Sequence, residues 1–316
     1  MSARRIGLVA CVALVVANMV GTGVFTSLGF QLVEIASRPA ILLLWSLGGI
    51  LALCGALSYA ELSAALPRSG GEYHFLSAVY HPALGFMAGI VSVVVGFAAP
   101  VALSSMAFGS YLQGVFPGIP PLASSVSIVA VVTMFHLRTL RVSSVFQVIF
   151  TTIKVALVIF LSVALLAAPA SPPPPPAPLL SCVFTTPFAV SLMFTLYAYS
   201  GWNAATYILD EVRTPARMIP LALGLGTVLV AVMYLALNNA FLHAAPVSAM
   251  AGKINVAQIA AEAAFGASGG KLVAGIIALG LVSAISAMVW AGPRVAMVIG
   301  EDYPRVFGVL GRRNAH

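Results

Sequence analysis

Two hydrophobic segments are each interrupted by small residues, and such interruptions free backbone groups that can bind a charged ligand. The first interruption is Gly21-Thr22-Gly23, and the second is Ser200-Gly201. Irregular backbone at membrane depth must be buried in protein or line a cavity. Free carbonyls before a break suit an ammonium group, and free N–H groups after it suit a carboxylate. The two breaks therefore predict a site for an α-amino acid, although glycines can also simply allow close helix packing.

Lys154 is the one lysine inside an apolar segment, and it is not close to either end of that segment. A charge at mid-membrane depth costs at least about 2.5 kcal/mol, so it requires a partner or a function. The carbonyls of an interrupted helix are suitable partners. Two roles stay open for this lysine: a fixed cation in the place of a sodium ion, or a group that releases a proton.

Aromatic and polar side chains flank the second break. A bulky ring such as Trp202 can close over a small ligand, or it can be ordinary packing. Asn203 can cap the following half-helix or hydrogen-bond across a cavity. The charges that follow are predicted either to pair with the loop Pro67–Tyr73 or to be solvated: Asp210, Glu211 and Arg213.

The composition is that of a polytopic membrane protein. Of 316 residues, 61% are hydrophobic and 7% are charged, whereas soluble domains carry about 25% charged residues. The net charge of +7 lies in short loops without a basic stripe, which argues against nucleic-acid binding. The sequence has no metal-ligand spacing, nucleotide-binding loop or catalytic triad, so neither an enzyme nor a cofactor is expected.

The hydropathy pattern predicts eight membrane spans. They are Ile6–Val33, Ala40–Leu66, Pro82–Leu112, Leu122–Leu137, Phe146–Ala167, Phe188–Leu209, Ile219–His243 and Leu272–Ile299. Pro100 is the expected kink point of the long third span. A short amphipathic helix is expected over Val256–Ala264, ending near Gly266 and acting either as an inert surface helix or as a gate.

The basic residues predict the orientation. Eleven fall on one side: Arg4, Arg5, Arg68, Arg138, Arg141, Arg213, Arg217, Arg294, Arg305, Arg312 and Arg313. Three fall on the other: Arg38, Lys253 and Lys271. This bias predicts that both termini are cytoplasmic and that the protein lies in the cell's inner membrane.

The broken segments are the first and the sixth predicted spans, so five spans separate equivalent positions. Each repeat unit thus contains five spans, an odd number, so the chain leaves the first repeat on the opposite side of the membrane. The second copy must therefore be inverted, which predicts an inverted-topology repeat. We expect one transmembrane domain over residues 1–316. It consists of a five-helix repeat (1–168), a partial second repeat (187–301) and a cytoplasmic tail (302–316).

Several motifs resemble those of the amino acid–polyamine–organocation (APC) transporters. Val20-Gly21-Thr22-Gly23-Val24-Phe25 is similar to their first-span signature, and Leu66–Tyr73 resembles their first cytoplasmic loop. The stretch Tyr197–Asn203, with the residues that follow it, is similar to the L-type amino acid transporter (LAT) branch, and Gly292–Arg294 resembles the end of the eighth span. This resemblance implies a LeuT-type inverted-repeat fold, all-α with its first and sixth helices broken. It also implies secondary transport of amino acids.

The resemblance also implies roles for individual residues. Those implied to bind substrate are Met19, Thr22, Gly23, Tyr197, Ala198 and Ser200. Those implied to gate the site are Trp202 and Asn203. Lys154 matches a fifth-span lysine that in relatives sits near the place where other members hold sodium, so sodium coupling is not expected and Lys154 is the implied coupling residue.

The chain departs from this family in two ways. Relatives usually carry twelve spans, so we expect a fragment, a truncated reading frame or a degenerate copy. A non-transporting membrane fragment is thus the alternative to a permease or exchanger. Animal LAT members bond a heavy subunit through a cysteine after the third span. The loop Gln113–Pro121 has none, so no disulfide-linked partner is expected.

The expected partners are an amino acid substrate, protons or a counter-exchanged amino acid, and the lipid bilayer. The substrate is expected to be a neutral or small L-amino acid, because no acidic side chain stands beside the breaks in the sequence.

Overall fold

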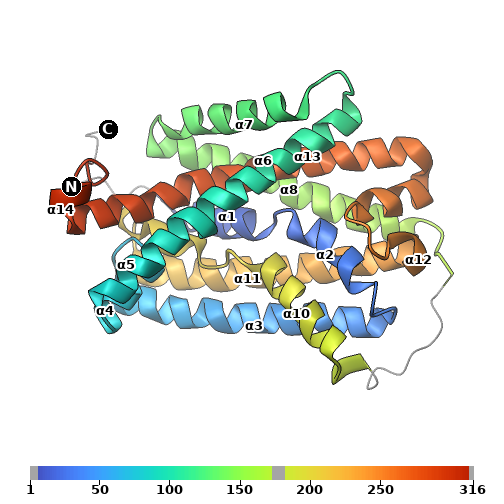
Figure 1. Ribbon diagram of the computed structural model, residues 1–316, viewed down its shortest axis with the longest axis horizontal. Coiled ribbons are helices and arrows are strands. Elements are labelled where there is room, and N and C mark those ends of the chain that lie inside the picture. The colour runs from blue at the N-terminus through green and yellow to red at the C-terminus, as the bar shows by residue number, and fades with distance from the viewer. Residues whose placement is uncertain (1–5, 173–181, 313–316) are drawn as a thin grey trace.

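The computed structural model describes residues 6–172 and 182–312, and these residues form an almost entirely helical bundle (Figure 1). Within them, six helical segments are long and apolar enough to cross a membrane: Leu8–Gln31, Arg38–Ala65, Pro82–Val115, Leu140–Ala167, Pro215–Ala244 and Val256–Asp302. This confirms the predicted all-α polytopic membrane protein. Among the predicted cytoplasmic basic residues, Arg4, Arg5 and Arg313 lie outside the described ranges.

Two of the eight predicted spans do not form membrane-length helices. The fourth is α7 (Pro121–His136), whose 16 residues extend about 24 Å, less than the roughly 30 Å of hydrocarbon. The sixth divides into α10 (Thr186–Tyr199) and the 3₁₀ helix η2 (Ala204–Glu211). Its division follows from Gly201, whose φ of 100° ends the regular helix. The described residues therefore contain six membrane-length helices, and the fourth and sixth predicted spans consist of shorter ones.

The third span is irregular one turn before the expected kink point. It consists of α5 (Pro82–Val91), the π-helix η1 (Ser92–Ala98) and α6 (Ala99–Val115). Pro100 has no N–H group, and its ring crowds the carbonyl four residues earlier. The wider π-helical turn relieves that crowding on the N-terminal side of the proline.

The predicted surface helix is the first part of α13 (Val256–Asp302), which is interrupted at Gly266, where φ is 73°. Its buried stripe is shifted from the predicted one. Ala257 and Ala261 are buried with Val256 and Ala260, whereas Ala263 is exposed.

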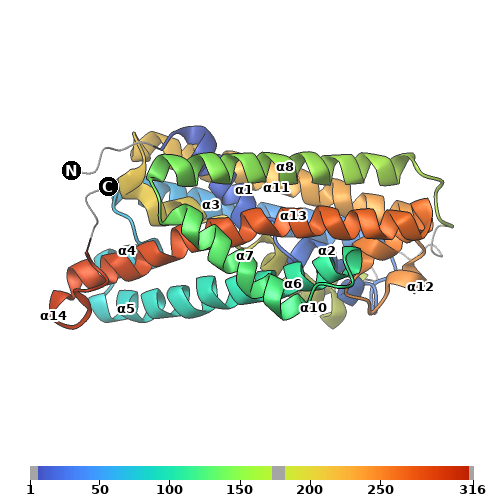
Figure 2. The same cartoon turned by 90° about the horizontal axis from the view of Figure 1, so that it is seen from above.

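The centre of the bundle is formed by α1 (Leu8–Met19), which packs against α8 (Leu140–Ala167), α11 (Pro215–Ala244) and α13. The helix α11 also lies along α3 (Arg38–Ala65). Figure 2 shows α13 between α8 and the α5–α6 segment. The two broken segments therefore meet in the interior, where side chains from several helices can reach them.

One end of the bundle gathers the loops that carry most of the basic residues. Arg68 donates hydrogen bonds to Asp302 at 2.7 and 3.1 Å, which ties the loop after α3 to the end of α13. The Ser69 hydroxyl accepts a hydrogen bond from the Asp210 N–H at 2.9 Å, and the Ile6 carbonyl accepts one from the Arg213 N–H at 3.1 Å. Figure 1 shows α4 (Glu72–Val79) and α14 (Pro304–Phe307) at this same end.

Candidate functional site

The first interruption separates α1 from α2 (Gly23–Gln31). The helix α1 ends at Met19, and Val20 then leaves the helical region with φ −80° and ψ 82°. The first N–H groups of a helix have no partner within that helix. The N-terminus of α2 therefore presents donors and a partial positive charge to whatever lies in front of it.

The second interruption follows Tyr199, the last residue of α10. Ser200 is extended (ψ 152°), and Gly201 has a φ of 100°, a conformation that other residues rarely adopt. A Cβ atom on Gly201 would lie only 2.7 Å from the Asn18 amide nitrogen. Glycine is therefore required here both for its backbone angle and for close approach.

The two interruptions contact each other directly. The Asn18 side-chain amide donates a hydrogen bond to the Gly201 carbonyl at 3.3 Å. A Cβ atom on Gly23 would lie 2.9 Å from the Ala198 Cα atom, so α2 and α10 approach backbone to backbone. The glycines thus allow close helix packing at the same place where they interrupt the helices.

A cavity of about 70 Å³ lies between the two interruptions. All six residues predicted to bind substrate line it: Met19, Thr22, Gly23, Tyr197, Ala198 and Ser200. Its other walls include Ser104 from α6 and Met288 from α13. The structure therefore gathers residues nearly 180 positions apart in sequence around one small space.

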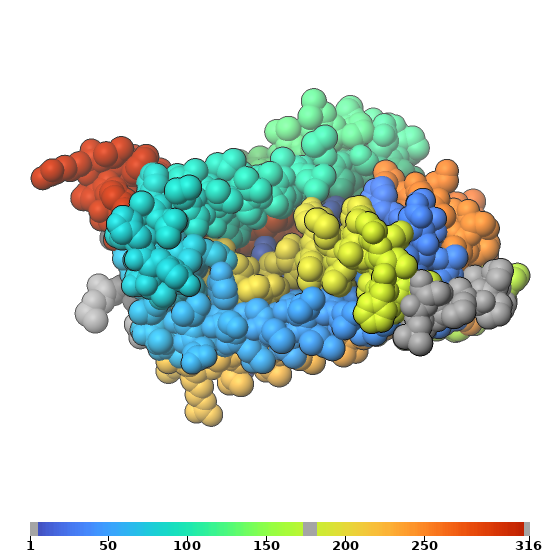
Figure 3. Space-filling model, turned by 60° about the horizontal axis from the view of Figure 1, so that its bottom comes forward, coloured from blue at the N-terminus to red at the C-terminus, as the bar shows by residue number. Residues whose placement is uncertain are grey.

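The two predicted gate residues line a second, larger cavity of about 500 Å³. Both cavities share lining residues, among them Asn18 and Ser200. The Trp202 ring packs edge-on against Tyr59 at 4.9 Å and lies over Gly55, where an added Cβ atom would be 2.7 Å from the ring. Figure 3 shows this face of the molecule hollowed between α5 and α3, beside α10.

Glu72 is an acidic residue of this second cavity that the sequence interpretation did not place beside the breaks. Its carboxylate accepts hydrogen bonds from the Asn203 amide and from the Tyr207 hydroxyl. The expectation that no acidic side chain stands near the breaks was therefore wrong. The error arose because Glu72 begins α4, in the loop after α3, and only the folded chain brings that loop to Asn203.

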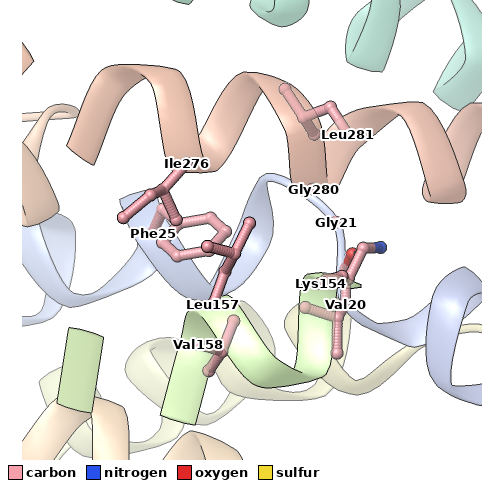
Figure 4. Close-up of a pocket in the computed structure, with 9 residues that line it drawn as sticks. All are labelled: Val20, Gly21, Phe25, Lys154, Leu157, Val158, Ile276, Gly280 and Leu281. Carbon is pink, nitrogen blue, oxygen red and sulfur yellow. The ribbon is translucent and has the colours of Figure 1, made fainter. Parts of the chain in front are cut away.

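Lys154 lies against the first interruption rather than in either of these cavities. Its ammonium group donates hydrogen bonds to the Ala17 carbonyl at 3.1 Å and to the Val20 carbonyl at 2.5 Å. The side chain is fully buried, at 2% exposure. Figure 4 shows Lys154 beside Val20 and Gly21, at one side of a small, mostly apolar pocket. The expected pairing of this lysine with carbonyls of an interrupted helix is thus seen.

A row of polar side chains continues from Lys154 along α8. Thr151 donates a hydrogen bond to the Ala13 carbonyl at 3.3 Å, and Gln147 donates to the Thr151 hydroxyl at 3.0 Å. The Ser286 hydroxyl of α13 donates to the Gln147 side-chain oxygen at 2.6 Å. These contacts fix α8 against α1 and α13, and so hold Lys154 in place.

Tyr234 of α11 bridges the two interruptions, and sequence reasoning missed it. Its hydroxyl oxygen lies 2.7 Å from the Met19 carbonyl and 3.0 Å from the Ala198 carbonyl. The residue is fully buried. A tyrosine in an apolar span requires a hydrogen-bond partner. That requirement was the available signal, although it does not identify the partner.

The charged residues after η2 pair differently from one another. The Asp210 side chain accepts a hydrogen bond from the Ser69 backbone at 3.4 Å, as expected for pairing with the loop Pro67–Tyr73. Glu211 pairs instead with Arg294 of α13, at 2.8 Å, and accepts a hydrogen bond from Trp290 at 3.3 Å. Glu211 therefore joins η2 to α13 rather than to the loop.

Comparison with known proteins agrees with this architecture. A profile of the amino acid permease family matches residues 6–307. The chain is 27% identical over 302 residues to the serine/threonine exchanger SteT of Bacillus subtilis (strain 168), covering 94% of this chain and 68% of that protein. It is 31% identical over 249 residues to the b(0,+)-type amino acid transporter 1 of Mus musculus, covering 75% of this chain and 51% of the relative.

A further relative is the Asc-type amino acid transporter 1 of Mus musculus, which is 30% identical over 253 residues, with 76% of this chain and 48% of the relative covered. The chain spans about half the length of the two mouse relatives. Because the family profile extends over nearly every described residue, the chain belongs to the amino acid permease family.

Proposed function

We propose that the chain carries the substrate site of a secondary-active amino acid transporter, a permease or exchanger that works by alternating access. The observation that carries this proposal is the cavity of about 70 Å³ that residues of both interruptions line. Membership of the amino acid permease family and the names of the relatives support it. The likeness to a serine/threonine exchanger favours a small neutral amino acid as one substrate.

In this proposal backbone groups bind the two charged groups of the substrate. The carboxylate meets the N–H groups at the start of α2, where Thr22 and Gly23 line the cavity. The ammonium group meets carbonyls at the end of α10. The carbonyls of Ala17 and Val20 are not assigned to the substrate, because they accept hydrogen bonds from Lys154 and neither residue lines the smaller cavity. Side chains around the cavity then select among substrates.

The gate in this proposal is Trp202 with Asn203. The Trp202 ring lies against Gly55 and Tyr59 of α3, an arrangement that leaves the larger cavity free. Closure requires the ring to leave α3 and cover the smaller cavity. Asn203 holds the turn after the break through its hydrogen bonds to Glu72 and Tyr207.

Lys154 is proposed as the coupling residue, acting either as a fixed cation or as a group that releases a proton. The end of the bundle that gathers Arg68 and Arg213 is proposed to face the cytoplasm, consistent with the bias of basic loop residues. The proposed setting is the inner membrane of a cell, and no disulfide-linked heavy subunit is invoked.

A second candidate is a protein that keeps the fold but does not transport. The observation that favours it is the chain's coverage of about half of its mouse relatives. Reconstitution separates the two. The 316-residue chain is placed in liposomes, and uptake of labelled serine is measured with internal serine, with a pH gradient and with neither.

Uptake driven by internal serine supports exchange, whereas uptake driven by the pH gradient supports proton coupling. Binding of serine without uptake supports the second candidate. Absence of both binding and uptake, in a chain that keeps its helical circular dichroism, contradicts the proposed substrate site.

A further inference from the structure

The third span contains a further irregular segment, the π-helix η1, and this segment lies beside the larger cavity. Val95, Gly96 and Phe97 of η1 all line that cavity. Short π-helical turns inside α-helices are rare and occur frequently at functional sites. Irregular backbone at membrane depth must be buried in protein or line a cavity. The backbone groups of η1 are therefore candidates for binding a ligand.

The C-terminal end of η1 is short of hydrogen-bond donors. The N–H group of Ala99 bonds to the Val94 carbonyl, five residues earlier, in the π-helical pattern. The next residue, Pro100, has no N–H group. The α-helical pattern of α6 then includes the Ala102 N–H, which reaches back four residues. Between these two donors only the N–H of Val101 is available.

Three carbonyls share that one N–H group, those of Val95, Gly96 and Phe97. Two of the three therefore have no regular helical donor. A carbonyl without a partner is costly in an apolar environment, so it requires another donor. Gly96 has no side chain to cover its backbone, and a Cβ atom added there would meet nothing closer than Ser92, at 3.9 Å. A ligand in the larger cavity can therefore supply the missing donors.

The surroundings favour a positively charged donor. No lysine, arginine or histidine is among the described residues that line the larger cavity, and the charged group in its lining is the Glu72 carboxylate. The rings of Phe97 and Trp202 in the same lining also favour a cation. Backbone carbonyls can replace the hydration shell of a cation. An ammonium group, which only donates, fits these acceptors, whereas a carboxylate, which only accepts, does not.

The larger cavity adjoins the smaller one near these carbonyls. Pro100, Tyr197 and Ser200 line both cavities. Pro100 follows Gly96 by four residues, which is about 6 Å along a helix. An ammonium group at the boundary between the two cavities is thus about one helical turn from the carbonyls of η1.

We propose that the free carbonyls of η1 form a second, weaker subsite for the ammonium group of the amino acid, occupied as the substrate passes between the larger cavity and the smaller one. This inference rests on the proposed substrate site between the two helix interruptions. It assigns a binding role to a third irregular segment, in the span that contributes Ser104 to the smaller cavity. Because its ligands are acceptors, the η1 subsite binds an amine that has no carboxylate.

The test measures binding of labelled ethanolamine to the full chain in lipid nanodiscs. Serine is added at a concentration that saturates each variant, so that the smaller cavity is already filled. We expect the wild-type chain to bind ethanolamine, more weakly than serine, and not to bind labelled 3-hydroxypropionate. Pro100→Ala supplies the missing N–H group, which occupies one of the free carbonyls. It should weaken ethanolamine binding roughly tenfold, the effect of losing a hydrogen bond to a charged group.

Pro220→Ala is the matched control. Pro220 also lies inside a helix, α11, and it is outside both cavity linings, so the same substitution restores an N–H group far from η1. Its ethanolamine affinity should equal that of the wild-type chain. Equal affinities in Pro100→Ala and the wild-type chain would mean that another group, such as the Glu72 carboxylate, holds the amine, and would overturn the inference.

A second pair of variants applies if Pro100→Ala does not fold. Gly96→Ala adds a methyl group beside the Gly96 carbonyl and should weaken ethanolamine binding. Gly114→Ala is its control, because a Cβ atom there also has 3.9 Å of clearance and the residue is outside both linings. Equal binding by these two variants would overturn the inference.

The outcomes separate this inference from the proposed function. A wild-type chain that binds serine but no ethanolamine overturns the η1 subsite and leaves the substrate site standing. A wild-type chain that binds no serine contradicts the proposed substrate site. In that case ethanolamine binding that Pro100→Ala weakens and Pro220→Ala does not still supports the η1 subsite, and its absence overturns both.

Discussion

The Asn18 side-chain amide donates a hydrogen bond to the Gly201 carbonyl at 3.3 Å, and this contact joins the two interrupted helices. Each interruption alone could be explained by helix packing. Together they enclose a cavity, and the Tyr234 hydroxyl lies beside the carbonyls of Met19 and Ala198, which line it. Lys154 binds the neighbouring Val20 carbonyl at the first interruption. The site therefore works as one unit, and changes on either side of it should affect the same ligand.

Gly21→Ala should weaken amino acid binding without unfolding the chain. Gly21 lines the smaller cavity, and a Cβ atom added there would meet nothing within 4 Å, so the methyl group occupies space that the ligand needs. Overpacking of this kind costs about 1–3 kcal/mol, or roughly 5- to 150-fold in affinity. Isothermal titration with serine measures the change.

Gly224→Ala is the control for that substitution. Gly224 lies in α11 outside the cavity lining, and a Cβ atom there also meets nothing within 4 Å. Equal affinities of the two variants for serine would mean that the ligand does not occupy the cavity.

Tyr234→Phe should lower both stability and substrate affinity. The substitution keeps the ring but removes the hydroxyl that lies near the Met19 and Ala198 carbonyls. A buried carbonyl left without a donor costs about 1–3 kcal/mol, and both interruptions lose a common support. Thermal unfolding and serine binding are measured on the same preparation.

Tyr199→Phe provides the comparison for Tyr234. The Tyr199 hydroxyl also donates to a buried carbonyl, that of Trp45, at 3.0 Å, but this carbonyl is outside both cavity linings. The two variants should lose similar thermal stability, and only Tyr234→Phe should lose affinity. Similar affinity losses in both would contradict a specific role for Tyr234 at the breaks.

Lys154→Ala should reduce exchange at least about tenfold, because the Ala17 and Val20 carbonyls lose their donor in a buried place. The pH profile separates the two roles of the lysine. A fixed cation predicts serine exchange that varies little between about pH 6 and 8 in the wild-type chain. A proton-releasing lysine predicts exchange that changes with pH in the wild-type chain and not in the variant. Wild-type rates in Lys154→Ala at every pH would remove the proposed coupling role.

Removing the charge of Arg294 should destabilise the junction between η2 and α13. Arg294 and Glu211 form an ion pair at 2.8 Å with side chains only 20% and 14% exposed. A hydrogen bond between charged groups contributes about 1.5–3 kcal/mol. The double-mutant cycle of Arg294→Gln and Glu211→Gln should therefore give a clear coupling energy in thermal unfolding. Additive effects would show that the pair does not contribute to stability.

The positions of the two interruptions could be predicted from the sequence because glycine pairs inside apolar segments are a local signal. The six residues that line the smaller cavity were implied by the resemblance to the APC transporters, whose motifs cover both interruptions. The pairing of Lys154 with helix carbonyls was predictable because a buried ammonium group requires acceptors.

Other features depend on contacts between distant parts of the chain. Glu72 reaches Asn203 only because the loop after α3 folds against η2, and Tyr234 reaches both breaks only because α11 packs against α1. The hydropathy pattern of a sequence also does not show where a helix begins or ends. Two of the eight predicted spans correspond to the shorter helices α7, which begins at Pro121, and α10, which ends just before Gly201.

The most direct test of the central claim compares serine with analogues that lack one of its charges. Ethanolamine lacks the carboxylate, and 3-hydroxypropionate lacks the ammonium group. If the two helix interruptions bind both the ammonium group and the carboxylate, serine should bind the purified chain and each analogue should bind at least about tenfold more weakly. Binding of either analogue as tightly as serine would contradict the account.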